Sequence, residues 1–214
     1  TMYSSYTAAS FARKHDLAAR HDVNLEGALT WAFEFEDQPY FAGFRSLASN
    51  GIDKPVLNVF RMFSKMGRQR LTVESDAAVP LEIITRRGVR ARPDVSALAT
   101  KDGNKIAVLV WHYHDEDIPG EDAAVDLALN GMTSGVERVR MTHYRIDEKH
   151  SNAFSAWKRL GSPQQPTPEQ YASLEQAGRL AVLGPAEDAR VEQGKLRLRF
   201  LLPRQAVDLV VISQ

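Results

Sequence analysis

The residues best suited to chemistry lie together between positions 31 and 37, in the sequence WAFEFED. Aromatic residues alternate there with other residues, so an extended chain places the rings on one face and Glu34 and Glu36 on the other, before Asp37. An aromatic face can stack on the C–H face of a sugar ring, and carboxylates accept charge-assisted hydrogen bonds from sugar hydroxyls. The segment could hold a carbohydrate, although a core tryptophan followed by a solvated acidic loop fits the same pattern.

The elements around this segment follow a helix–strand–helix order. Residues 5–20 carry apolar side chains at helical spacing, and residues 25–35 form a mostly apolar run typical of a strand buried on both faces. A loop of about 16 residues follows, which is long for a simple connection. Asp53 and Pro55 then predict the start of a second helix over 54–66, which Gly67 ends.

A single buried parallel strand cannot exist alone, because its backbone groups need hydrogen-bond partners on both sides. We therefore expect residues 1–67 to be a piece of an α/β domain that folds only against further strands. The sequence opens in the approach to a helix, with neither a methionine nor an apolar signal segment at position 1. This predicts that the chain is the C-terminal part of a longer protein.

From about residue 68 the sequence pattern alternates with the period of a strand. Alternation and turn residues predict a second domain over 68–214, an antiparallel β-sandwich. The predicted strands are RLTVES, PLEIITR, KIAVLVWHYH, AVDLALNG, VERVRMTHYRI, KLRLRFLLP and AVDLVVIS. The sequence Thr167-Pro168-Glu169-Gln170 predicts a capping box that opens one short helix over about 168–177.

Composition excludes several classes of function. Lys and Arg together number 27, as do Asp and Glu, so no basic surplus favours a nucleic acid or an anionic membrane as partner. The chain has no cysteine, which excludes disulfides, thiol catalysis and cysteine-bound zinc within it. No apolar run approaches the roughly 20 residues that a membrane helix needs. The cellular compartment stays open.

A metal site is the second chemical hypothesis. His112 and His114 share one face of a predicted strand, and an acidic loop follows them. Since no third ligand stands at a suitable spacing, a strand that runs into an exposed acidic turn is the favoured interpretation, and neither metal nor cofactor is expected.

The sequence resembles the end of the catalytic domain of glycoside hydrolase family 39, the β-xylosidases. The resemblance lies in WAFEFED and in FAGFRSLASNGIDKPVLNVFRMFSKMG, where Phe41, Gly43, Phe44, Leu47, Gly51, Ile52, Lys54 and Pro55 follow in the family's order. The segments AWKRLG (156–161) and PTPEQY (166–171) are similar to segments of the family's α-L-iduronidases.

The resemblance implies a fold: 1–67 would be helix 7, strand 8 and helix 8 of a TIM (β/α)8 barrel, and 68–214 its β-sandwich. It implies retaining hydrolysis by two glutamates that precede residue 1, so no catalytic residue is expected in this chain. It also implies substrate-binding roles for Trp31, Glu36 and Asp37, with Glu34 second to Glu36. Related barrels suggest a cis peptide bond between Trp31 and Ala32.

The leading hypothesis is therefore the C-terminal part of an exo-β-D-xylosidase that acts on xylo-oligosaccharides, with the missing part of the barrel as its partner. An iduronidase-like or arabinosidase-like specificity is the alternative, in which Arg45 could pair with a sugar carboxylate. A non-catalytic carbohydrate-binding sandwich is the third hypothesis, and an exposed row formed by Trp111, Tyr113 and Trp157 would support it.

Overall fold

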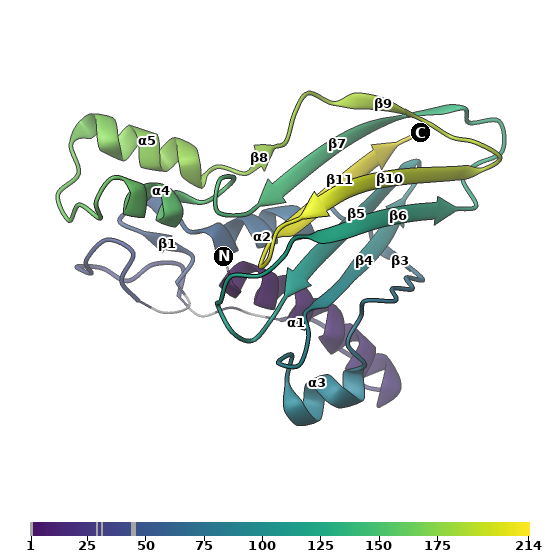
Figure 1. Ribbon diagram of the computed structural model, residues 1–214, viewed down its shortest axis with the longest axis horizontal. Coiled ribbons are helices and arrows are strands. Elements are labelled where there is room, and N and C mark those ends of the chain that lie inside the picture. The colour runs from purple at the N-terminus through teal and green to yellow at the C-terminus, as the bar shows by residue number, and fades with distance from the viewer. Residues whose placement is uncertain (1, 29, 31, 44–45) are drawn as a thin grey trace.

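The computed structural model describes residues 2–28, 30, 32–43 and 46–214. Its centre is a large antiparallel sheet in the order β3-β4-β5-β11-β7-β8, with β9 also paired to β7 (Figure 1). These strands span Gln69–Leu71 (β3), Asp94–Asp102 (β4), Lys105–Tyr113 (β5), Arg138–Ile146 (β7), Ala181–Val182 (β8), Glu187–Arg190 (β9) and Val207–Ser213 (β11). Strands β6 (Ala123–Asn130) and β10 (Lys195–Leu202) form a second antiparallel pair.

The central sheet is buried on both faces. Along β5, Leu109 and Trp111 point into one core, while Val108 and Val110 point into the other, as the alternation of side chains in a strand requires. The second core lies between the sheet and the β6–β10 pair, whose partly buried side chains pack against it. The alternating pattern thus correctly predicts the two-layered β architecture.

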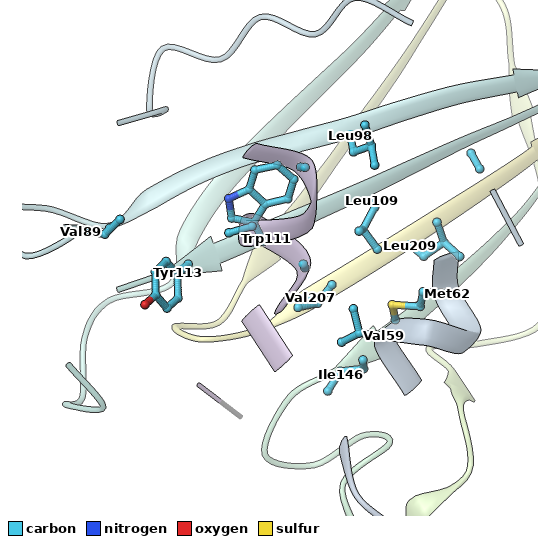
Figure 2. Close-up of a cluster of buried hydrophobic side chains, with 14 of the residues drawn as sticks. Val59, Met62, Val89, Leu98, Leu109, Trp111, Tyr113, Ile146, Val207 and Leu209 are labelled. Carbon is cyan, nitrogen blue, oxygen red and sulfur yellow. The ribbon is translucent and has the colours of Figure 1, made fainter. Parts of the chain in front are cut away.

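Two helices cover the other face of the sheet. Helix α1 (Met2–Arg20) contributes Ala8, Ala9 and Ala12 to the first core, and these small side chains let the helix approach the sheet closely. Helix α2 (Pro55–Phe63) adds Val59 and Met62. Figure 2 shows both α2 residues beside the side chains of β5 and β11. The helices predicted from 5–20 and 54–66 are confirmed, and both share a core with the sheet.

The prediction of a strand over 25–35 is wrong for this structure, because the described residues of that segment are not in a strand. Phe33 is 57% exposed and Phe35 is 38% exposed. A strand of the parallel type needs neighbours on both sides, and the described part of the chain offers it none. Whether this segment is the last strand of a barrel stays a prediction, as do the domain boundaries.

Several further elements differ from the sequence predictions, and the short strands β8 and β9 were not among the predicted strands. PLEIITR, predicted as a strand, forms helix α3 (Leu81–Arg87), in which Leu81 and Ile84 lie one turn apart on the buried side. Helix α4 (Ala153–Arg159) and strand β4 were not predicted. Helix α5 (Pro168–Gly178) is confirmed, together with the capping box between Thr167 and Gln170. Figure 1 shows α4 and α5 side by side at one end of the sheet.

Among the described residues, no helix is long and apolar enough to cross a membrane.

Candidate functional site

The acidic segment belongs to a compact loop that residues 33 and 54 enclose. The carbonyl oxygen of Phe33 accepts hydrogen bonds from the backbone N–H groups of Leu47 at 2.8 Å and Ala48 at 2.9 Å. Strand β1 (Ala48–Ser49) then pairs with β2 (Ile52–Asp53). These bonds close the loop at its base, and its described residues between 34 and 53 are called the lobe.

Glu34 has a structural partner inside this loop. Its Oε1 accepts a hydrogen bond from the N–H of Gly51 at 2.9 Å, at the tip of the β1–β2 hairpin. One carboxylate oxygen is therefore already engaged with the backbone. This leaves Glu34 with less free hydrogen-bonding capacity than Glu36, and the substrate-binding roles of both stay a prediction.

Glu36 and Asp37 lie in a turn at the exposed side of the lobe. The backbone of Asp37 has a φ of 53°, a left-handed conformation that aspartate tolerates better than most residues. Within the described residues, neither carboxylate has a hydrogen-bond or ion-pair partner. Both are available to accept hydrogen bonds from a ligand. Trp31 and the peptide to Ala32 lie outside the described residues, as does Arg45.

Lys54 holds the second half of the lobe. Its Nζ donates to the carbonyl oxygens of Ala42 at 3.0 Å and Gly43 at 3.1 Å, and to the Oγ of Ser46 at 2.5 Å. Burial lowers the pKa of Lys54, and the negative charge of Glu34 opposes that change by favouring the ammonium form. Sequence analysis included Lys54 in the family resemblance but gave it no role.

The α4 helix supports the lobe by aromatic packing. The ring of Phe41 lies 5.1 Å from that of Trp157 and 5.7 Å from that of Phe154, measured between centroids. The indole Nε1 of Trp157 donates to the carbonyl oxygen of Pro163 at 2.9 Å, which fixes the indole in place. Since Phe41 has a positive φ of 57°, this packing holds a backbone conformation that a phenylalanine rarely adopts.

The segment around α5 adds two polar contacts. Tyr171 donates its hydroxyl to the carbonyl oxygen of Asn50 at 3.1 Å. Gln164 accepts through its side-chain oxygen from the N–H of Tyr40 at 2.8 Å. The lobe is therefore held from two sides. Lys54, the residue just before α2, holds it on one side, and the α4–α5 region holds it on the other.

A cavity of about 260 Å³ adjoins the lobe. Its lining combines Phe41 and Phe154 with the polar residues Ser46 and Asp117. Asp117 is exposed and comes from the connection between β5 and β6, far away in the sequence. The sequence analysis placed it in the acidic loop that follows His114 but did not connect it with this cavity, because no local pattern places that connection beside Phe41 and Ser46.

The histidine pair has structural roles. His112 Nδ1 lies 3.0 Å from the carbonyl oxygen of Leu202, and His114 Nε2 lies 2.9 Å from that of Arg90. Burial lowers the pKa of His112. In the part of the chain that the structure describes, no cluster of three ligand-type side chains could hold a metal ion.

The aromatic residues of β5 are also structural. Trp111 is 1% exposed and Tyr113 is 9% exposed, and both belong to the core between the sheet and the helices (Figure 2). Trp157 packs on Phe41. The exposed aromatic row considered for a carbohydrate-binding module is therefore not present on this strand.

The chain is thus a mixed α/β protein with a large antiparallel sheet and an acidic loop at one end. The family model "Glycosyl hydrolases family 39" matches residues 4–186, and the chain belongs to this family.

Curated relatives include both specificities considered above. The chain is 27% identical over 185 residues to a β-xylosidase of Geobacillus stearothermophilus, covering 85% of this chain and 32% of that protein. It is 30% identical over 164 residues to the α-L-iduronidase of Mus musculus, covering 73% of this chain and 24% of that protein. The chain spans less than a third of the length of these relatives.

Solved structures agree in fold. A GH39 enzyme from Xanthomonas axonopodis pv. citri matches with a TM-score of 0.63 at 20% identity, covering 82% of this chain and 33% of that one. A monomeric β-xylosidase from Caulobacter crescentus matches with a TM-score of 0.62 at 18% identity, covering 86% of this chain and 36% of that chain. The arrangement of helices and sheet is therefore that of family 39 enzymes.

Proposed function

We propose that this chain is the C-terminal part of a retaining exo-β-D-xylosidase and supplies one wall of its sugar pocket. The observation that carries the proposal is the pair Glu36 and Asp37. Both are exposed and without partners among the described residues, on a loop that Lys54 and Tyr171 hold by hydrogen bonds. Family membership gives the reaction class, and the catalytic glutamates would lie in the part of the enzyme that precedes this chain.

In this proposal the lobe binds the terminal sugar. Carboxylate oxygens of Glu36 and Asp37 accept hydrogen bonds from neighbouring sugar hydroxyls, and Trp31 stacks on the sugar ring. A pocket closed on this side admits only the end of a xylo-oligosaccharide, which explains release of single sugars. Residues 1–67 would complete a (β/α)8 barrel, and residues 68–214 would form the accessory sandwich.

An iduronidase-like specificity is the second candidate. The mouse α-L-iduronidase is slightly more identical to this chain than the bacterial β-xylosidase is, over a shorter alignment. An iduronate carboxylate needs a cationic partner, and Arg45 would supply one from the same loop. The two substrates differ by that carboxylate, so a direct comparison separates them.

The test uses the full-length enzyme that contains this chain, with aryl β-D-xyloside and aryl α-L-iduronide as substrates. A hydrogen bond to a charged group contributes about 1.5–3 kcal/mol, so Glu36→Gln and Asp37→Asn should each lower kcat/KM about 10- to 100-fold. Glu26→Gln is the matched control, because Glu26 is an exposed carboxylate ahead of the acidic segment and accepts a hydrogen bond from the neighbouring Asn24. Unchanged kcat/KM in both site variants would show that the lobe is not part of the sugar pocket. Faster hydrolysis of the iduronide than of the xyloside would favour the second candidate.

A further inference from the structure

We propose that Lys54 is a positioning residue that sets the place of Glu36 and Asp37 in the sugar pocket. This inference rests on the proposed function. Lys54 makes no contact with either carboxylate among the interactions that the structure describes, so it would act through the backbone of the lobe.

The hydrogen bonds of Lys54 use its full capacity. An ammonium group has three N–H donors, and the Nζ of Lys54 has three acceptors, the carbonyl oxygens of Ala42 and Gly43 and the hydroxyl of Ser46. Lys54 is 9% exposed, which is unusual for a lysine, and Ser46 is 3% exposed. Because all three donors of this buried ammonium group bind acceptors in one short segment, Lys54 restricts the conformation of that segment.

The fixed segment is connected to the acidic turn on both sides. The N–H of Lys54 donates to the carbonyl oxygen of Leu47 at 2.9 Å, and the N–H of Leu47 donates to the carbonyl oxygen of Phe33 at 2.8 Å. Lys54 therefore holds the chain that leaves the turn, while Phe33 anchors the chain that enters it. Glu36 and Asp37 lie between these anchors.

A neighbouring carboxylate supports the buried charge. Glu34, which binds the N–H of Gly51, is the acidic group whose charge favours the ammonium form of Lys54 against the cost of burial. Removing the ammonium group would leave the buried hydroxyl of Ser46 and the carbonyl oxygens of Ala42 and Gly43 without their donor. Ala42, Gly43 and Ser46 would then rearrange toward water, and the turn would lose one of its two anchors.

The experiment replaces Lys54 by methionine, which keeps the length of the side chain and removes its donors. We expect the KM of the full-length enzyme for aryl β-D-xyloside to rise about tenfold, while kcat changes by about twofold or less, because the turn binds hydroxyls and not the reacting atoms. Ser46→Ala removes one of the three acceptors and should raise KM about two- to threefold. Lys195→Met is the matched control, since Lys195 is an exposed lysine on β10.

A double-mutant cycle tests whether Lys54 acts through the turn. If it does, adding Lys54→Met to Glu36→Gln should raise KM much less than the product of the two single effects, because the misplaced carboxylate is already gone. Should the methionine variant fail to fold, Ser46→Ala in the same cycle provides the test. If the rise in KM of the double variant equals the product of the two single rises, the effects are independent and the inference is overturned.

The outcomes separate this inference from the function on which it rests. A wild-type enzyme without activity on any glycoside would refute the proposed function and the inference together. An active enzyme in which Glu36→Gln raises KM, while Lys54→Met and Ser46→Ala leave it unchanged, would refute the positioning role alone.

Discussion

Replacing Asp94 by asparagine should destabilise the fold where α1 packs on the sheet. The side chain of Asp94 is fully buried and accepts three hydrogen bonds from three parts of the chain. Its Oδ1 accepts from the N–H of Val79 at 2.7 Å and from Nη2 of Arg13, on α1, at 2.8 Å. Its Oδ2 accepts from the indole Nε1 of Trp111, on β5, at 2.9 Å.

Asparagine has nearly the same shape but only one acceptor oxygen. In either orientation its NH₂ group meets an N–H donor, which leaves at least one buried donor unsatisfied at a cost of about 1–3 kcal/mol. Arg13 also loses the closer of its two anionic partners and keeps only the pairing with Asp16 at 3.5 Å. Since breaking a buried ion pair costs about 3–5 kcal/mol, we expect the Asp94→Asn variant to lose about 3–5 kcal/mol of unfolding free energy.

Urea unfolding followed by tryptophan fluorescence measures this loss. With a slope of about 2–3 kcal/mol/M, the midpoint should fall by about 1–2 M urea. Asp188→Asn is the control, because Asp188 is exposed and pairs with Arg140 at 3.4 Å; its effect should stay within about 0.5 kcal/mol. An Asp94→Asn midpoint indistinguishable from that of the control would refute the role given to this carboxylate.

Two further substitutions have defined outcomes. Gly51→Ala would place a Cβ 2.7 Å from the Tyr171 hydroxyl at a φ of 77°, whereas a Cβ at Gly103 would have open space at a φ of 57°. We expect Gly103→Ala to lose about 1–2 kcal/mol of unfolding free energy, measured by thermal unfolding, and Gly51→Ala to lose clearly more. Equal losses in the two variants would contradict the contact with Tyr171. Hydrogen bonds from Arg197 and Arg199 lower the pKa of Asp126 to about 2. Because this folded-state pKa is depressed, the stabilisation is present above about pH 4 and is lost as the pH falls toward 2. The difference in Tm between wild type and Asp126→Asn should shrink over that range, and a constant difference would count against the pairing.

Local patterns predicted the elements whose side chains follow one clear period. The strands β5, β7, β10 and β11 and the helices α1, α2 and α5 were all found in this way, because apolar side chains recur on one face or along both faces. Strand β4 was missed because its buried positions carry small or polar residues such as Ser96, Ala99 and Thr100. Helix α3 was predicted as a strand because Ile83 and Ile84 are β-branched, although Pro80 and Gly88 stand at its two ends.

The acidic turn could be located from the sequence, but its surroundings could not. Residue types and the family resemblance were sufficient to single out Glu36 and Asp37. The partners of the lobe are long-range: Tyr171 lies 121 positions from Asn50, and Gln164 lies 124 positions from Tyr40. Local periodicity carries no information about such pairs, because it reports only which face of an element is apolar. Likewise, nothing in the spacing of Glu34 indicates that it binds Gly51.

Three of the segments that resemble family 39 meet through these long-range contacts. The segment AWKRLG contains Trp157, which packs on Phe41, and the segment PTPEQY contains Tyr171, which binds Asn50. Phe41 and Asn50 both belong to the stretch FAGFRSLASNGI that resembles the family's last barrel loop. Three segments that are separate in sequence therefore meet at one lobe. A change in any one of them should therefore alter the packing of the other two.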